Sequence, residues 1–238
     1  SILNINSAPI GKISNIAISA NWMSAYDDEK EKIDLFNMVK NTSKIVRDFG
    51  ITIPVGKDSL SMKTTWADTA GKILNVKSPN TLIASSFSEV KDLAKKIPAG
   101  FQNIKNSKII YINLGPDKPR MGGSSLSQVF SIDDPNCPNL YDAEIFKNTV
   151  NLVQNLMLGN KIASYHDVSD GGLFISVAES CFAGHLGVNI YIDNNDSLIE
   201  FMFNEELGIV IQVKDDYVDE IKNKFSNIGI DIYIRRIK

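Results

Sequence analysis

The alternation of strand-like and helix-like segments in the second half of the chain is the feature that most restricts the fold. Short β-branched runs have the composition of buried strands, and apolar residues recur at helical spacing in the segments between them. The predicted strands are 109–114, 162–165, 188–192, 209–213 and 230–234. The predicted helices are 142–158, 173–182 and 217–225. Interleaving of this kind predicts an α+β unit in which helices cover a mixed sheet.

The first half has fewer elements. A helix is predicted from Asp27 to Phe49, because apolar residues recur at helical spacing, acidic residues fill the first turn and Gly50 is placed to end it. Strand-like runs are 13–20, 51–55 and 81–87, and a turn is predicted at Gly56. Since little precedes the first run, we expect a partial α/β domain here.

A domain boundary is predicted between residues 89 and 107. This stretch has a short charged helix and is then interrupted by proline, glycine and asparagine, which favour loops over regular structure. We therefore predict a partial amino-terminal-type domain at 1–104 and a carboxy-terminal-type domain at 105–238.

Composition excludes several classes of function. The chain has 238 residues, 43% of them hydrophobic, with a net charge of -3 and mean hydropathy of -0.07. Basic residues are spread along the sequence, so nucleic acid is not expected as a partner. No apolar run approaches the roughly 20 residues that span a bilayer, and two cysteines without CxxC spacing predict free thiols. These features predict a cytoplasmic protein without a membrane partner.

The segment His166 to Gly172 is the strongest candidate site. It joins a predicted strand to a predicted helix, and it holds two carboxylates, a hydroxyl and an imidazole. Carboxylates suit Mg²⁺, which is bound through one or two of them together with phosphate oxygens. Gly171 and Gly172 would let backbone amides at the helix start approach a phosphate. The alternative is that Asp170 caps the helix and the glycines relieve strain in a tight turn.

A second candidate is Gly56-Lys57-Asp58-Ser59. It resembles part of a P-loop, but Ile51 stands where that motif requires its first glycine, so it is not a Walker A sequence. A glycine turn with a lysine and hydroxyls could still hold an anionic substrate or a nucleotide phosphate. The alternative is a solvated loop, since lysine is mostly exposed.

Two further loops have open roles. The loop from Gly115 to Gln128 contains Gly122, Gly123 and Ser124, which suit either a phosphate cradle or a flexible connection. The segment 204–208 is expected to link two strands, with Glu205 and its acidic neighbour as base, ligand or solvated turn. A zinc site at Cys181 and His185 is not expected, because Gly184 should end the helix between them.

Four segments, in order, resemble the phosphoribosylformylglycinamidine synthase family in its large, single-chain form. They are 20–23 (ANWM), 53–62 (IPVGKDSLSM), 165–173 (YHDVSDGGL) and 203–208 (FNEELG). The resemblance covers the end of the second synthetase amino-terminal domain and the whole second carboxy-terminal domain, which is of the aminoimidazole ribonucleotide synthetase type. It implies a ligase that uses ATP and Mg²⁺ to convert formylglycinamide ribonucleotide to formylglycinamidine ribonucleotide, with ammonia from glutamine.

The resemblance also implies roles for particular residues. Asp167 would bind the metal and Ser169 a nucleotide, ATP or ADP, that is retained rather than turned over. Gly56 would lie near the nucleotide, and Ser59 and Lys57 near the substrate. Since the small form of the synthase has asparagine at the position of Lys57, a phosphate contact suits this residue better than a metal.

The resemblance further implies partners and alternatives. The expected partners are the nucleotide, the small-molecule substrate and the remaining domains of the same enzyme, including the glutaminase. The other metal ligands would come from the missing part of the amino-terminal domain, so the fragment is expected to be inactive alone. The alternatives are a nucleotide-binding or interaction module, and a free-standing aminoimidazole ribonucleotide synthetase-like enzyme.

Overall fold

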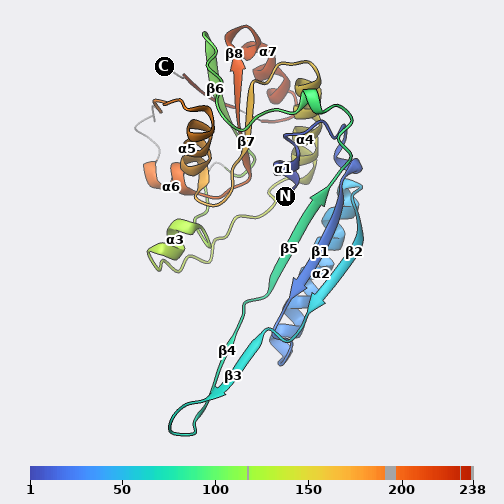
Figure 1. Ribbon diagram of the computed structural model, residues 1–238, viewed down its shortest axis with the longest axis vertical. Helices are drawn as coiled ribbons and strands as arrows, with labels where there is room; N and C mark the ends of the chain where they lie inside the picture. The colour runs from blue at the N-terminus through green and yellow to red at the C-terminus, as the bar shows by residue number, and fades with distance from the viewer. Residues whose placement is uncertain (117, 191–196, 231, 237–238) are drawn as a thin grey trace. The chain divides into compact units, whose positions relative to one another are not determined.

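The computed structural model describes residues 1–116, 118–190, 197–230 and 232–236 (Figure 1). They form two compact units. Unit 1 consists of Ser1–Ile2 and Ile13–Glu89, and unit 2 consists of Leu3–Lys12 and Val90–Lys238. The segment Leu3–Lys12, here called the strap, therefore belongs to unit 2 although unit 1 follows it in the sequence.

Unit 1 is built on a three-stranded sheet in the order β2-β1-β5. β1 (Ala17–Met23) pairs in parallel with β2 (Thr52–Ser59) and antiparallel with β5 (Thr81–Phe87). A short 3-10 helix (Ile13–Asn15) precedes β1, where the sequence predicted strand from residue 13. Because Ile18 and Ala20 are buried, one face of the sheet belongs to the core of this unit.

The long helix of unit 1, α2 (Glu29–Phe49), confirms the predicted helix and its ending (Figure 1). Asp28 caps the first turn by accepting a hydrogen bond from the Glu31 amide, and Gly50 adopts the left-handed conformation with φ of 71°. The ending at Gly50 was predicted, because this signal is local to the helix end. The predicted start at Asp27 is two residues early, because Asp28 is the capping residue and the helix begins at Glu29.

A two-stranded hairpin, β3 (Lys63–Ala67) and β4 (Ile73–Lys77), also belongs to unit 1. Asp27, just before α2, connects to both of its strands through ion pairs of 2.7 Å with Lys63 and with Lys77. These hydrogen-bonded ammonium groups lower the pKa of Asp27 to about 2. The hairpin is therefore joined to the start of the helix by charge as well as by the chain.

Gly56 lies inside strand β2, so the predicted turn at this position is wrong. It pairs with Ala20, and the parallel pairing with β1 continues as far as Ser59. A Cβ atom at Gly56 would lie 3.2 Å from the ring of Trp22. The glycine makes room for this ring on the neighbouring strand and does not reverse the chain.

Unit 2 contains a four-stranded sheet in the order β7-β8-β6-β9. The strands are β6 (Ser107–Asn113), β7 (Ser164–Asp167), β8 (Gly208–Lys214) and β9 (Tyr233–Arg236). All three described pairings are antiparallel, so the α+β class is confirmed but the predicted mixed pairing is wrong for this sheet. The reason is that β8 lies between the parallel-running β6 and β7, so these two strands never pair.

Helices complete unit 2 (Figure 1). They are α1 (Ile2–Ile5), of which Leu3 onward belongs to this unit, α3 (Ser125–Val129), α4 (Ala143–Leu158), α5 (Gly172–Gly184), α6 (Leu198–Phe203) and α7 (Asp215–Ser226), with a 3-10 turn at Leu93–Lys95. Residues 188–190 of the predicted strand 188–192 are not in a strand, and residues 191 and 192 lie outside the described part. The segment 204–208 links helix α6 to β8 rather than two strands.

The core of unit 2 lies on β8, whose Ile209, Val210, Ile211 and Val213 are all buried. Val150 and Val153 of α4 and Ile221 and Phe225 of α7 are buried as well. This burial supplies the main stabilising term for the unit. In the described part of the chain, no helix combines the length and apolar character needed to cross a membrane.

The strap is held in unit 2 by the side chain of Gln154 from α4, which is fully buried. Gln154 Nε2 donates to Asn6 O, Asn6 Oδ1 and Ala8 O at 3.1, 2.8 and 2.9 Å, while its Oε1 accepts from the Gly11 amide at 2.9 Å. One side chain thus satisfies polar groups along much of the strap.

Candidate functional site

The glycine turn begins where β7 ends at Asp167 and leads directly into α5. Gly171 and Gly172 both have positive φ, at 83° and 70°. A Cβ atom at Gly172 would lie 2.4 Å from the carbonyl oxygen of Asn204, so the turn requires glycine. The residue at the helix cap is Gly171, with no side-chain capping bond. The alternative that Asp170 caps the helix is therefore wrong.

The backbone amides of the turn are already engaged within the protein. Gly172 N donates to Ser169 O at 2.9 Å, and Gly171 N donates to Glu205 Oε1 at 2.8 Å. The expectation that these two amides approach a phosphate is therefore not supported by their geometry. The turn offers a ligand the side chains of Asp167, which is half-buried, and of Ser169 and Asp170, which are exposed.

Asn4 of the strap lies beside Asp167. Its Nδ2 donates to Asp167 Oδ1 at 3.2 Å, and the two residues are 163 positions apart in the sequence. Sequence reasoning missed Asn4, since no local signal connects it to the glycine turn. Asparagine carries an amide oxygen as well as the amide nitrogen, so rotation of this group would offer an oxygen ligand next to the carboxylate.

Asp167 offers carboxylate oxygens, and rotation of the Asn4 amide would add a further oxygen ligand. Across residues 1–116, 118–190, 197–230 and 232–236, no group of three or more His, Cys, Asp or Glu side chains is arranged to hold a metal. One carboxylate and one amide oxygen fit Mg²⁺, which takes few protein ligands and completes its shell with phosphate oxygens and water. These residues therefore suit a cation that arrives with a nucleotide, not one held by protein alone.

His166 is half-buried, and both of its ring nitrogens lie near oxygen atoms of unit 2. Its Nδ1 lies 2.7 Å from the carbonyl oxygen of Asp167, and its Nε2 lies 3.1 Å from Glu179 Oε2 on α5. With both ring nitrogens engaged in this way, His166 holds the end of β7 against α5. It does not add a ligand beside Asp167.

Glu205 and Glu206, in the loop after α6, form hydrogen bonds with the loop 115–128, and Glu205 also binds the glycine turn. Glu205 Oε1 accepts hydrogen bonds from Gly171 N and from Ser125 N, both at 2.8 Å. The fully buried Glu206 accepts from Arg120 Nε and Nη2, both at 2.7 Å, and this carboxylate raises the pKa of Arg120. Sequence reasoning had left three roles open for this acidic pair: base, ligand or solvated turn. The hydrogen bonds of both carboxylates exclude the solvated turn and the free base.

The loop 115–128 is shaped by internal contacts. Gly122 N donates to Asn136 O at 3.0 Å, and a Cβ atom there would lie 2.4 Å from Asp134 O. Ser124 is buried and caps α3 by accepting from Ser127 N at 3.2 Å. Gly122 and Ser124 therefore have structural roles, and the described contacts do not leave their amides free as a phosphate cradle.

The other predicted residues lie together on β2 of unit 1. Lys57 Nζ donates to Ser59 Oγ at 2.6 Å, as expected for residues two apart on one face of a strand. Gly56 precedes Lys57 on the same strand and pairs with Ala20 of β1. The structure thus groups Lys57 with Ser59, and separately groups Asp167 with Asn4.

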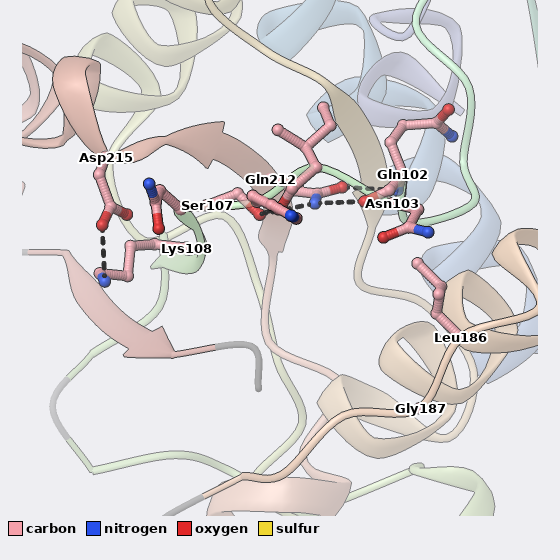
Figure 2. A pocket seen from close by; sticks show the side chains of 11 residues that line it. Gln102, Asn103, Ser107, Lys108, Leu186, Gly187, Gln212 and Asp215 are labelled. Atoms are coloured by element: carbon pink, nitrogen blue, oxygen red, sulfur yellow. Dashed lines mark hydrogen bonds and ion pairs between the residues drawn. The ribbon is translucent and has the colours of Figure 1, made fainter.

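A polar cavity of about 650 Å³ lies elsewhere in unit 2, lined by residues 102–108, 186–187, 212 and 215 (Figure 2). Figure 2 shows Gln212 between Gln102 and Ser107, to which its side chain is hydrogen-bonded at 2.7 to 3.0 Å. Lys108 and Asp215 form an ion pair of 3.1 Å across one end. No residue predicted from the sequence as a site lines this cavity.

Family models match both halves of the chain. Residues 106–234 match the family model of the AIR synthase related protein, C-terminal domain, and the chain belongs to this family. Residues 1–89 match the model of the FGAR-AT PurM_N-like domain. The two matches together identify the chain as a member of the PurM and FGAR-AT family.

Solved structures share the fold at low sequence identity. PurLQS from Thermotoga maritima has a TM-score of 0.62 and 11% identity, over 98% of this chain and 35% of that one. T. maritima PurL complexed with FGAR has a TM-score of 0.60 and 11% identity, over 97% and 39%. E. coli HypE, a hydrogenase maturation protein, has a TM-score of 0.55 and 15% identity, over 98% and 71%. The chain thus spans little more than a third of the T. maritima proteins.

Proposed function

We propose that this chain supplies half of a Mg²⁺-nucleotide site to a phosphoribosylformylglycinamidine synthase of the large, single-chain form. The observation that carries the proposal is the contact of Asn4 with Asp167 at the start of the glycine turn. It brings two oxygen-bearing side chains together at Asp167, two positions before the exposed Ser169 in the sequence, on a fold whose family match covers this unit.

Solved relatives support a nucleotide as the ligand. T. maritima PurL, which shares this fold, has been obtained in complexes with ATP, AMPPCP and ADP. In this chain Asp167 and Asn4 would bind the cation, and Ser169 would donate a hydrogen bond to a phosphate oxygen. Magnesium, when bound, would neutralise phosphate charge and so keep the nucleotide in place.

Unit 1 would contribute to substrate binding. The ammonium group of Lys57 and the hydroxyl of Ser59 lie together on β2, where they suit a phosphate group of a small-molecule substrate. Gly56 would allow a nucleotide to approach the strand. The complete reaction would amidate formylglycinamide ribonucleotide with ammonia from a glutaminase domain in the cytoplasm, and the remaining domains would complete the catalytic site. Alone, this chain would not catalyse it.

Asp167→Asn is expected to weaken the binding of Mg-ADP to the chain at least tenfold, because it removes the negative charge that attracts the cation. Isothermal titration calorimetry with the wild type and the variant measures this effect. Asp170→Asn, an exposed neighbour in the same turn, is the matched control and should change the affinity little. Equal affinity of wild type and Asp167→Asn would contradict the proposed role.

A second candidate function is self-association through unit 1. Val55, Ile83 and Phe87 are at least 50% exposed and share one face of the sheet, since they pair with Ser19, Asn21 and Ala17 of β1. Monomeric proteins rarely expose large contiguous apolar patches. Sedimentation velocity over a concentration series should then show a dimer that Phe87→Ser weakens. A strictly monomeric wild-type chain would contradict this candidate.

A further inference from the structure

Two alternate residues of β7 meet two consecutive residues of the strap. Tyr165 Oη donates to Leu3 O at 2.7 Å, and Asp167 Oδ1 accepts from Asn4 Nδ2 at 3.2 Å. Residues two apart on a strand point to the same face, so Tyr165 and Asp167 both face the strap. The backbone at Leu3 is fixed one residue before the side chain that reaches Asp167.

Tyr165 is well suited to fix this backbone. Its side chain is 2% exposed, and burial raises its pKa far above the ordinary value for tyrosine. Its hydroxyl thus donates to the Leu3 carbonyl from within the core of unit 2. Leu3 is buried as well, and its carbonyl also accepts from Asn6 N at 3.2 Å, which places it in the first turn of the strap.

The strap has a second attachment farther along. Gln154 binds it at Asn6, Ala8 and Gly11, but no bond of Gln154 reaches Leu3 or Asn4 among those that the structure describes. The orientation of Asn4 relative to Asp167 therefore depends most directly on the bond between Tyr165 and Leu3.

We propose that Tyr165 is a positioning residue of the candidate cation site: its hydroxyl holds the Leu3 carbonyl and thereby keeps the Asn4 amide against Asp167. The inference rests on the proposed function, because it assigns a purpose to the contact between Asn4 and Asp167. Tyr165 itself touches neither cation nor nucleotide. Its effect on binding must therefore pass through Asn4.

A double-mutant cycle tests this coupling. Tyr165→Phe keeps the ring and removes only the hydroxyl, and it should raise the Mg²⁺ concentration for half-maximal ADP binding about tenfold, the lower end of the effects seen for outer-shell partners of metal ligands. Asn4→Ala should do the same. The double variant should be no worse than either single variant, because both remove one shared interaction. Tyr141→Phe, an exposed tyrosine of unit 2, is the control and should behave as wild type.

Amide hydrogen exchange of the chain without ligands gives an independent readout. In Tyr165→Phe the strap amide of Asn6 should exchange several-fold faster, while those of β8 should be unchanged. Unchanged exchange of the strap, unchanged Mg²⁺ dependence, or additive effects of Tyr165→Phe and Asn4→Ala would each overturn the proposal. A wild-type chain that binds no Mg-ADP would instead contradict the proposed function, and the exchange experiment would still decide whether Tyr165 holds the strap.

Discussion

Arg120→Met is expected to lower the free energy of unfolding of unit 2 by about 3 kcal/mol, the size of effect found when one partner of a buried ion pair is removed. Glu206 is 0% exposed, and its carboxylate receives two hydrogen bonds from the Arg120 side chain. Without these two bonds, the buried Glu206 carboxylate would keep, among the described bonds, the one from the backbone amide of residue 120. Urea denaturation followed by circular dichroism measures the change.

The matched control for this experiment is Lys108→Met. It breaks the ion pair of 3.1 Å with Asp215, a side chain that is 40% exposed. Exposed pairs contribute about 0 to 1 kcal/mol, so this variant should be close to wild type. If Arg120→Met lowered the free energy of unfolding no more than Lys108→Met, the Arg120–Glu206 pair would not be what stabilises the loops around the glycine turn.

Gln154→Leu is expected to lower the free energy of unfolding of unit 2 by about 3 kcal/mol and to detach the strap from α4. The substitution preserves volume but leaves the Gly11 amide and the Asn6 carbonyl without the partner that Gln154 supplies, and each buried unsatisfied group costs about 1 to 3 kcal/mol. Because the strap carries Asn4, limited proteolysis near the amino terminus should accelerate at the same time.

Gln128→Leu serves as the control for Gln154→Leu. Gln128 is exposed and makes a single bond of 2.8 Å, from its Nε2 to Gly123 O, so its loss should cost less than 1 kcal/mol. Proteolysis of the strap should stay at the wild-type rate. A Gln154→Leu protein with wild-type stability and an intact strap would show that the strap is held by its apolar residues alone.

Local signals in the sequence predicted much of the fold. The end of α2 was predictable because Gly50 acts within one turn of the helix, whereas its start was placed two residues early, at Asp27. Gly56 was misread because its purpose depends on the ring of Trp22 on another strand. Helix α6 escaped prediction because it has six residues and no side-chain cap. Strand direction in unit 2 was misjudged because the alternation of elements does not reveal that β8 lies between β6 and β7.

The candidate site was predictable only where its residues are adjacent in the sequence. Asp167 and Ser169 stand in one recognisable turn, and their ligand roles remain predictions. Asn4 lies 163 residues from Asp167, and Glu205 joins amides 34 and 80 residues away. Such partners are brought together by the packing of the strap and of the loop after α6. The spacing of residues in the sequence does not predict packing of this kind.

The central claim is that a nucleotide binds at Asn4 and Asp167 together with Mg²⁺. The most direct measurement is calorimetric titration of ADP into the wild-type chain, once with magnesium and once with a chelator. We predict binding that requires magnesium and that Asp167→Asn abolishes or weakens at least tenfold. Absence of binding under both conditions, or equal affinity with magnesium and with chelator, would contradict the claim.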